Sequence, residues 1–547
     1  MTYLQDIKVG KYLYRYKVRS YRDNGKVKQE REYIGKVINK EGKEVVIPPR
    51  RLLPSHVSEV RRYGLFQILY NIAKEWDIAE TIEDVSPIAK KNDYGSAILL
   101  LSINHVTDRK ALDKIGEWYR YSALYPHLGD AELFSKKRLL DAMDSLVYED
   151  EYENLFDFTF QITQKIRAME ARLIGENSNA GLIYDITEVA SYSENNPYAD
   201  LGYSPVNENN KLVKVCLVTE RETHLPVHIF IVNGNLPDKS TVREMLSRLS
   251  AVEIDKKKSC MIMDRGMMSE ENMVLYKDEG LEVIAGMTAR RKDVEDLIAS
   301  VNESEFIQSA NAIKRAGGGI TYVLERPFKT DKIEGRNLIC LVPDLQNNVR
   351  AARFLAIHEI TKEIERRNEN KWHKLPSNDI ERVATNIVTP IKSFVEINVD
   401  ADKRFVGYRL NENKLKKQVN LDGRFSLFST NTELTKEEIF DAYFSRDAIE
   451  KAFEIYKGEL DLPPIRHWKH KRILSYLQIC FISYLMQSYL MYKVKKAGLT
   501  MGWTDLKFML ERMQQVVLDT PTGQKIEIAN ITSAHKKLME KIGYPIM

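Results

Sequence analysis

The chain has 547 residues, which is too long for one hydrophobic core and predicts three or four domains. Hydrophobic residues make up 43% of it and charged residues 29%, an ordinary balance for a soluble globular protein. The four cysteines lie far apart without a CxxC pair, which argues against a zinc knuckle or a disulfide framework and fits a reducing cytoplasm. No basic-then-apolar signal peptide opens the sequence.

The N-terminal segment is basic. Residues 1–51 hold fourteen Lys or Arg against six Asp or Glu, although the whole chain carries only +4. Residues 12–19 alternate with period two and lead to Asn24-Gly25, which predicts a β-hairpin with one aromatic and one basic face. A basic face suits a phosphate backbone; the alternatives are a small docking ribbon or a simple effect on solubility. The residues predicted to contact DNA here are Arg15, Lys17 and Arg19.

A helical pattern runs from about residue 56 to 176, with turn signals at Pro87 and at Tyr125-Pro126. It contains no short motif that identifies a particular DNA-reading domain. The expectation that this region recognises DNA ends therefore depends on the residues that follow it.

From residue 181 the period changes to that of β-strands. Three strand-like runs are followed by a helix, a buried strand ending at Asp264, a second helix capped by Ser269, and a fifth strand. This order resembles that of the RNase H-like fold, whose catalytic carboxylates lie on the first strand, after the fourth strand and on a later helix. Asp185, Asp264 and Glu450 occupy those places. The first three strand-like runs are 181–193, 211–218 and 225–232, and the fifth strand is 281–287.

The pattern breaks between 288 and 430. A polar glycine-rich stretch is followed by a helix rich in Arg and Glu at 349–367. β-like segments then follow at 393–399, 404–410 and 424–430. These features predict a β-rich insertion, whose last segment returns the chain to the sheet.

Thr435 and Glu438 have the spacing of a capping box, which predicts the start of the helix that carries residues 443–457. At about 100° per residue, four side chains of this helix share one narrow stripe. A phenol, two cations and a carboxylate aligned in this way suit a phosphate backbone with a metal ion beside it. The alternative is an exposed helix with ordinary i, i+4 pairing. The four residues are Tyr443, Arg446, Glu450 and Lys457.

Residues 473–492 form a run of twenty positions without a charge, long enough to span a membrane. The run contains two glutamines and three serines, which a lipid-facing helix would rarely accept. It therefore predicts a helix buried inside a large domain, and no membrane contact. A C-terminal tail follows from about residue 498.

Together these motifs resemble those of a known family. Tyr-x2-Arg-x3-Glu-x6-Lys matches the YREK motif of bacterial insertion-sequence DDE transposases. YDIT at 184–187 resembles the first-aspartate motif of the family, and MDRGMMSEEN around Asp264 resembles the second. DGRFSLFSTN at 422–431 resembles the strand that introduces the helix. The resemblance covers about 180–490, and the N-terminal region resembles that of the longer members more loosely.

The resemblance implies a two-metal active site. Phosphodiester transfer needs a nucleophilic oxygen, a stabilised leaving oxygen and neutralised charge, and two Mg²⁺ ions about 4 Å apart supply all three. Mn²⁺ is the expected substitute. Magnesium takes hard oxygen ligands, so Asp185, Asp264 and Glu450 are the expected catalytic residues and metal ligands. They must converge in the fold, because 79 and 186 positions separate them in the sequence.

The resemblance also implies the order of events on DNA. Hydrolysis at the end of the element frees a 3′-hydroxyl, which attacks another strand, in YREK members by way of a DNA hairpin. Tyr443, Arg446 and Lys457 would contact the phosphates, since Arg suits bidentate contact and Lys a point charge. Trp372 is a candidate platform for a flipped base, with an ordinary surface or small-core tryptophan as the alternative.

The sequence therefore predicts a multidomain α+β protein. Its RNase H-like α/β core has a mixed five-stranded sheet flanked by helices and is interrupted by the insertion. The resemblance implies a DDE transposase acting on terminal inverted repeats and target DNA, as a homodimer on double-stranded DNA in the bacterial cytoplasm, at the nucleoid. The alternatives are a DNA-binding regulator without catalysis and an RNase H-like nuclease without strand transfer. The predicted segments are 1–55 (hairpin arm), 56–178 (helical domain), 179–290 and 431–515 (core), 291–430 (insertion) and 516–547 (tail).

Overall fold

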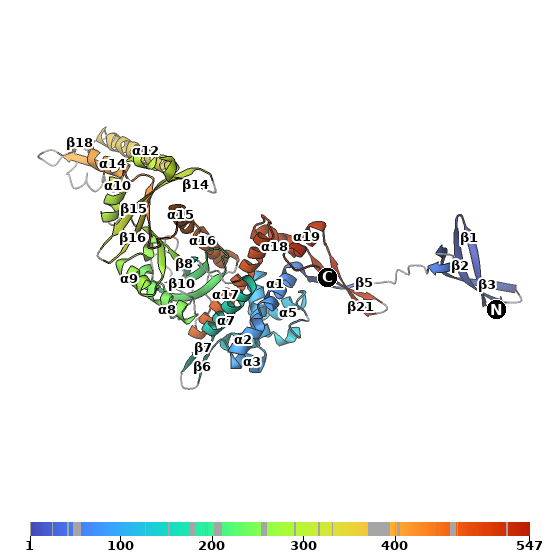
Figure 1. Ribbon diagram of the computed structural model, residues 1–547. Coiled ribbons are helices and arrows are strands. Elements are labelled where there is room, and N and C mark those ends of the chain that lie inside the picture. Colours follow the sequence, from blue (N-terminus) through green and yellow to red (C-terminus); the bar gives the residue numbers. More distant parts are fainter. Residues whose placement is uncertain are drawn as a thin grey trace. The chain divides into compact units, whose positions relative to one another are not determined.

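The chain forms two compact units. The first comprises Met1–Tyr63 and Glu511–Ile531, and the second Gly64–Leu510 and Thr532–Met547. The computed structural model (Figure 1) describes residues 2–23, 26–40, 43–47, 56–125, 127–150, 154–175, 181–191, 193, 195–201, 211–252, 260–288, 292–315, 318–330, 332–369, 394–399, 401, 405–459, 467, 469–520 and 523–546.

A four-stranded antiparallel sheet occupies the N-terminal part of the first unit, in the order β1-β2-β3-β4. The predicted hairpin is confirmed, because β2 pairs with β3 up to Asp23 opposite Lys26. Asn24 and Gly25 themselves lie outside the described residues. Val18 is fully buried in this sheet. The strands are β1 (Thr2–Val9), β2 (Tyr12–Asp23), β3 (Lys26–Lys40) and β4 (Lys43–Ile47); β1 and β4 were not predicted.

The second sheet of this unit joins segments about 450 positions apart in the sequence. Strand β20 (Gln514–Thr520) pairs on one side with β5 (His56–Arg62) and on the other with β21 (Gly523–Ala529), both antiparallel. The predicted division placed β5 at the start of the helical domain. Its sequence is too short and polar to indicate a partner so distant in the chain.

Helices dominate residues 64–174 of the second unit, as predicted, and further helices lie near the C-terminal end of the chain. The long helix α17 (His470–Lys496) contacts α1, α4 and α6. It is long and apolar enough to cross a membrane by length and composition, but 89% of its most apolar 18-residue window is buried inside the protein, which confirms the predicted core helix. The others are α1 (Gly64–Glu75), α2 (Ile78–Val85), α3 (Pro87–Asn92), α4 (Gly95–Val106), α5 (Ile115–Arg120), α6 (Lys136–Asp144), α7 (Thr159–Ile174), α18 (Trp503–Glu511) and α19 (Ser533–Lys541). A small hairpin, β6 (Val147–Glu149) and β7 (Leu155–Asp157), lies between α6 and α7.

One large mixed sheet organises the rest of the second unit, in the order β11-β10-β8-β12-β13-β19-β16-β15-β14, with β9 paired to β10. Strands β12 and β13 run parallel to β8, whereas β10 runs antiparallel to both of its neighbours, β8 and β11. The predicted strands are all present: β8 (Gly181–Ala190), β10 (Lys211–Glu220), β11 (Pro226–Asn233), β12 (Cys260–Met263) and β13 (Glu282–Met287).

The prediction of a five-stranded sheet is wrong. Strand β19 (Arg424–Ser429) pairs with β13 and also with β16, so part of the predicted insertion extends the same sheet. Sequence order hides this extension, because the strands that continue the sheet precede β19 in the chain. They are β14 (Ala312–Lys314), β15 (Ile320–Lys329) and β16 (Glu334–Leu341); β9 (Asp200–Leu201) was also not predicted.

Both faces of the sheet are covered. Leu182 and Tyr184 of β8 belong to a buried apolar cluster with side chains of α8 (Val242–Ala251), α9 (Glu270–Asp278) and α10 (Lys292–Ser300). Ile183, which points to the opposite face because side chains alternate along a strand, is fully buried as well. Strand β8 contacts α16, and β11 contacts α17. Asp185 therefore lies on the face opposite Tyr184.

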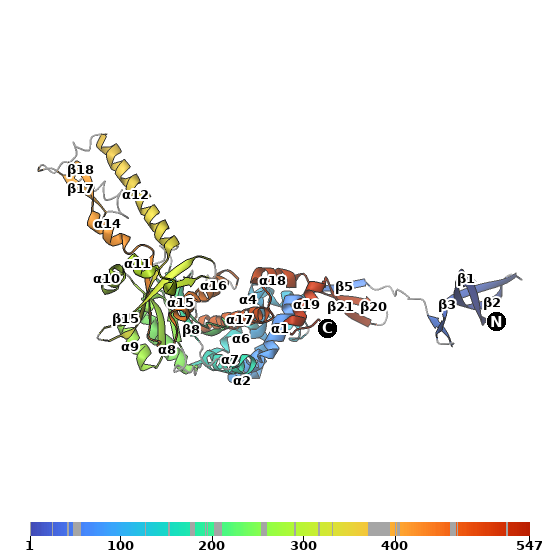
Figure 2. The same cartoon turned by 45° about the horizontal axis from the view of Figure 1, so that its top comes forward.

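The remainder of the predicted insertion carries the long helix α12 (Pro343–Glu369), the hairpin β17 (Val395–Val399) and β18 (Phe405–Leu410), and α14 (Glu412–Val419) (Figure 2). The hydroxyl of Tyr408 donates a hydrogen bond to Glu365 of α12 at 2.8 Å. The predicted helix and strands of this region are present. Trp372, the candidate base platform, lies outside the described residues.

The predicted motif helix is divided into three pieces. Helix α15 (Lys436–Phe444) starts at the predicted capping box, in which Thr435 and Glu438 exchange side-chain and backbone hydrogen bonds. Helix α16 (Asp447–Glu454) follows, and a π-helical turn (Ile455–Glu459) ends the segment. The nitrogen of Arg446 bonds to the carbonyl of Tyr443, three residues back, so the regular α-helical ladder is interrupted at this point. Tyr443 and Arg446 thus lie at a junction between helices.

Candidate functional site

The sheet brings the two predicted aspartates together. Tyr184 of β8 is directly paired with Met263 of β12, and the two strands are parallel. Asp185 and Asp264 are the next residues along their strands, so both carboxylates reach the same end of the sheet. Asp264 ends β12 as the N-cap residue of a 3₁₀ turn. The exposed fractions of the side chains of Asp185 and Asp264 are 15% and 39%.

Glu450 approaches the same place from α16, which contacts β8. The pKa of Asp185 is raised to about 6, first by burial and further by the charges of Asp264 and Glu450, against the lowering effect of Arg446 and of the Ile186 N–H. Each of the three acids therefore acts electrostatically on a common site. Asp264 and Glu450 are thus near enough to Asp185 to affect its pKa, and their role as one catalytic set stays a prediction.

Arg446 lies among these carboxylates. Its Nη1 is 3.0 Å from Oδ1 of Asp264 and its Nη2 is 3.8 Å from Oδ2 of Asp185. Nη1 also donates to the hydroxyl of Tyr443 at 3.2 Å. The Nε of Arg446 is buried and has no hydrogen-bond partner among the described residues, an arrangement that costs about 1–3 kcal/mol. The sequence predicted a phosphate contact for this side chain, whereas here it neutralises acids.

Gly286 of β13 makes room for Tyr443. A Cβ built on this glycine would lie 2.6 Å from the Tyr443 hydroxyl oxygen and 3.2 Å from its Cζ, closer than side chains tolerate. Burial raises the pKa of the Tyr443 phenol, so it stays protonated and can donate a hydrogen bond. Sequence reasoning missed Gly286, because nothing local distinguishes it from any other glycine in a strand.

Lys457 lies beside a different acid. Burial lowers the pKa of its ammonium group, and Glu188 of β8 opposes this effect. Glu188 in turn is close to Lys214, whose Nζ donates to Oδ1 of Asp238 at 2.6 Å. A Cβ built on Gly266 would lie 3.5 Å from Oδ2 of Asp238 and 4.0 Å from Oδ2 of Asp264. Sequence reasoning named Lys457 but missed the charged group that it joins, which comprises Glu188, Lys214 and Asp238.

The donor set suits magnesium in its chemistry. Asp185, Asp264 and Glu450 offer only hard carboxylate oxygens, which Mg²⁺ prefers, and few protein ligands suffice because the ion keeps several waters. Across the described residues, no group of three or more His, Cys, Asp or Glu side chains is close enough to enclose a metal ion as it stands. The Arg446 guanidinium lies against the two aspartates that would share such an ion.

The predicted basic residues of the first unit are partly engaged within their own sheet. Arg15 forms a two-pronged ion pair with Asp6, at 2.7 Å for each contact, and another with Glu44 at 3.0 Å. Lys17 and Arg19 are exposed but stand directly opposite acidic residues of β3, Glu32 and Glu30. Cross-strand partners lie on one face, so this face is less basic than β2 alone suggests. Their role in binding DNA stays a prediction.

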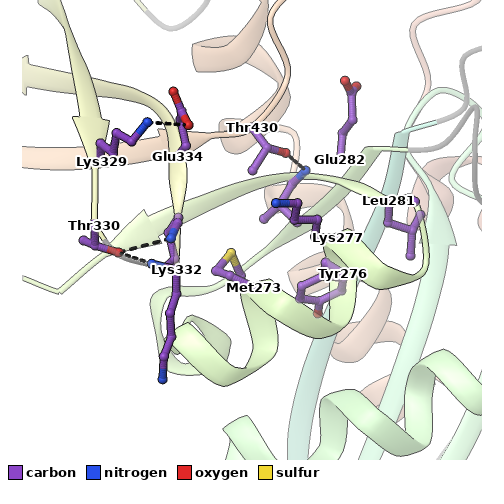
Figure 3. Close-up of a pocket in the computed structure, with 13 residues that line it drawn as sticks. Met273, Tyr276, Lys277, Leu281, Glu282, Lys329, Thr330, Lys332, Glu334 and Thr430 are labelled. Carbon is purple, nitrogen blue, oxygen red and sulfur yellow. Dashed lines mark hydrogen bonds and ion pairs between the residues drawn. The ribbon is translucent and has the colours of Figure 1, made fainter.

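A separate cavity of about 600 Å³ opens where β13 begins and β19 ends (Figure 3). It is lined by Lys277, by Thr430 and by the turn between β15 and β16, where Lys329 pairs with Glu334 at 2.9 Å. Because β12 and β13 are parallel, this is the opposite end of the sheet from Asp264. The cavity holds none of the predicted site residues.

Comparisons with known proteins add little to this picture. No family model and no curated protein matches the chain. Among solved structures, it is similar to a cryo-EM structure of a piggyBac transposase synaptic complex with hairpin DNA, at 10% sequence identity and a TM-score of 0.35. The match covers 82% of this chain and 78% of that chain. A fit of this level leaves the function to be inferred from the residues of the site themselves.

Proposed function

We propose that this chain is a DDE transposase of the YREK type with an RNase H-like catalytic core. It cleaves and joins DNA at the terminal inverted repeats of an insertion sequence. The observation that carries the proposal is the meeting of Asp185, Asp264 and Glu450 at one end of the sheet, around a single guanidinium. Carboxylates that lie this close repel one another, and a divalent cation with hard oxygen ligands would offset that repulsion.

In this proposal Asp185, Asp264 and Glu450 hold two Mg²⁺ ions, with Mn²⁺ as a substitute. When bound, these ions supply charge neutralisation at phosphorus and activation of the attacking oxygen. Tyr443 and Arg446 lie beside the acids, where a scissile phosphate would enter. Arg446 can grip two phosphate oxygens, the Tyr443 phenol can donate to a third, and Lys457 supplies a point charge from the π-helical turn that follows α16.

The partners proposed are double-stranded DNA ends and target DNA, with a homodimer on DNA because transposition joins two ends. A hairpin intermediate, a cytoplasmic location at the bacterial nucleoid, and DNA contacts by the N-terminal sheet belong to the same proposal. Two alternatives remain distinct from it: a DNA-binding regulator, which needs none of the three acids, and an RNase H-like nuclease, which would cut DNA without joining it.

The test is cleavage of labelled DNA from the borders of the segment in which the gene lies, with Mg²⁺. We expect the intact protein to nick the end or form a hairpin there. Glu450→Gln should bind the same DNA but cut it roughly a hundredfold more slowly or worse, because losing a metal ligand removes several kcal/mol of charge stabilisation. The matched control is Glu454→Gln, an exposed acid one turn further along α16.

Three outcomes decide between the functions. Cutting by the intact protein and by Glu454→Gln, but not by Glu450→Gln, supports the assignment of the third acid. If all three proteins bind DNA and none cuts it with any divalent metal, the regulator replaces the transposase. If the DNA is cut but no strand-transfer product forms with added target DNA, the nuclease replaces it.

A further inference from the structure

Arg446 makes contacts that a DNA-binding arginine does not need. Its side chain is 12% exposed, and its two terminal nitrogens are directed at Asp264 and Asp185, at 3.0 Å and 3.8 Å. Opposite charges at these distances attract strongly in a partly buried site. The guanidinium therefore satisfies the same aspartate charges that a metal ion would satisfy.

The guanidinium is nevertheless incompletely bonded in this position. Arginine has five N–H donors in a fixed planar fork. Here Nη1 serves Asp264 and Tyr443, the distance from Nη2 to Asp185 exceeds that of a hydrogen bond, and Nε has no partner among the described residues. A phosphate offers oxygens to two prongs of the fork at once. A phosphate held by Nε and Nη2 would therefore satisfy the two guanidinium nitrogens that make no hydrogen bond here.

Arg446 lies at the junction between α15 and α16, where its side chain takes no part in capping either helix. Arg446 precedes α16 as its N-cap residue, where the regular backbone ladder is interrupted, and the structure gives it no side-chain capping hydrogen bond. Within the part of the chain that the structure describes, its side chain donates hydrogen bonds to Asp264 and Tyr443 alone. Movement of the guanidinium thus breaks no helix-capping interaction.

We propose that Arg446 competes with the divalent cation for Asp185 and Asp264, and that a DNA phosphate relieves this competition by drawing the guanidinium away. This inference rests on the proposed function and adds to it a way in which DNA regulates cation binding at the same site. Linkage is reciprocal: if DNA tightens the binding of the cation, the cation tightens the binding of DNA by the same factor. Cations would load mainly on protein that already holds DNA, which would limit cleavage away from a docked end.

The test measures Mn²⁺ binding by calorimetry on the full chain, with and without duplex DNA from the borders of the locus. Arg446→Gln removes the guanidinium and keeps a shorter, uncharged polar side chain. Without DNA, we expect this variant to bind Mn²⁺ roughly tenfold more tightly than the unsubstituted protein, the effect expected when one charge-assisted contact no longer competes. With DNA, the two proteins should differ much less.

Two controls separate competition from a general effect of charge. Lys457→Gln removes one positive charge from the same segment, but from beside Glu188 and away from the two aspartates. Arg472→Gln removes an arginine paired to an aspartate elsewhere, at Asp144, where both contacts measure 2.8 Å. Neither should tighten Mn²⁺ binding as much as Arg446→Gln does.

Competition is overturned if Arg446→Gln leaves DNA-free Mn²⁺ affinity unchanged, weakens it, or tightens it no more than Lys457→Gln. The proposed function survives that result as long as the unsubstituted protein binds Mn²⁺ and Asp264→Asn abolishes the binding. If neither the unsubstituted protein nor Arg446→Gln binds Mn²⁺ with or without DNA, the metal site itself is wrong and both proposals fall.

Discussion

At the scale of single residues, the site depends on close approaches that only certain side chains permit. Gly286 is the clearest example, since the Tyr443 ring occupies the space of its missing Cβ. Tyr443 in turn accepts a hydrogen bond from Arg446, and Arg446 contacts Asp264. A change at Gly286 therefore reaches Asp264 through two intervening side chains.

Gly286→Ala should displace the Tyr443 ring and lower the cleavage rate by roughly ten- to a hundredfold, because small misplacements of site groups are costly. The ring is stiff, and Cβ of Arg265 lies only 3.4 Å from the added methyl position, which closes another way out. The measurement is single-turnover cleavage of end DNA. Gly502→Ala, at a glycine with nothing within 4 Å of its built Cβ, is the control and should cleave normally.

At the scale of elements, the turn after β11 positions Asp238, which belongs to the charged group around Lys214. A Cβ built on Gly234 would lie 1.9 Å from the backbone oxygen of Leu212 in β10. This turn leads to Asp238, which pairs with Lys214. A residue with any side chain at position 234 must push two backbone segments apart.

Gly234→Ala should lower the free energy of unfolding by about 3 kcal/mol, since rigid backbone, unlike a side-chain tip, cannot move aside cheaply. Urea unfolding followed by tryptophan fluorescence measures this loss. An unchanged transition midpoint would mean that the turn has room the structure does not indicate. Gly502→Ala again provides the comparison, with an expected change near zero.

At the scale of the whole molecule, a buried ion pair joins helix α7 to the large sheet. Arg167 of α7 contacts Glu170 on its own helix and Glu220 at the end of β10, where the distance is 2.8 Å. Burial, and then the neighbouring Glu220 charge, raise the pKa of Glu170 to about 8, while Arg167 opposes the rise. Burial alone would raise the pKa of Glu220, but Arg167 and hydrogen bonds from Thr223 and Glu170 together lower it. At neutral pH the carboxyl group of Glu170 therefore carries a proton, whereas that of Glu220 is ionised.

The raised pKa of Glu170 makes stability depend on pH. The folded chain holds this proton more tightly than the unfolded chain, so the stabilising contribution is complete below the ordinary glutamate pKa and is lost as pH rises through about 8. Thermal unfolding should occur at lower temperature at about pH 9 than at about pH 6. Glu170→Gln, which cannot ionise, should reduce this difference; an equal difference in both proteins would assign the loss to other groups.

The sequence by itself determined the order of many of the helices and strands along the chain. Alternating and helical periods are local properties, so they predicted the helical region, the buried α17 and the five strands β8, β10, β11, β12 and β13. The Thr435 capping box and the Ser269 N-cap are equally local, and both are present. The expectation that Asp185 and Asp264 meet came from the family resemblance, and in the structure their nearness follows from the pairing of Tyr184 with Met263 in parallel strands.

Only the tertiary structure decided the remaining features, because they depend on contacts between distant segments. The pairing of β5 with β20 and the extension of the sheet through β19 connect positions that no local pattern relates. The interrupted helix at Arg446 turns a predicted stripe of four side chains into two groups, one at the aspartates and one at Glu188. Whether an arginine meets a phosphate or a carboxylate depends on which groups surround it in space, and a sequence does not contain that information locally.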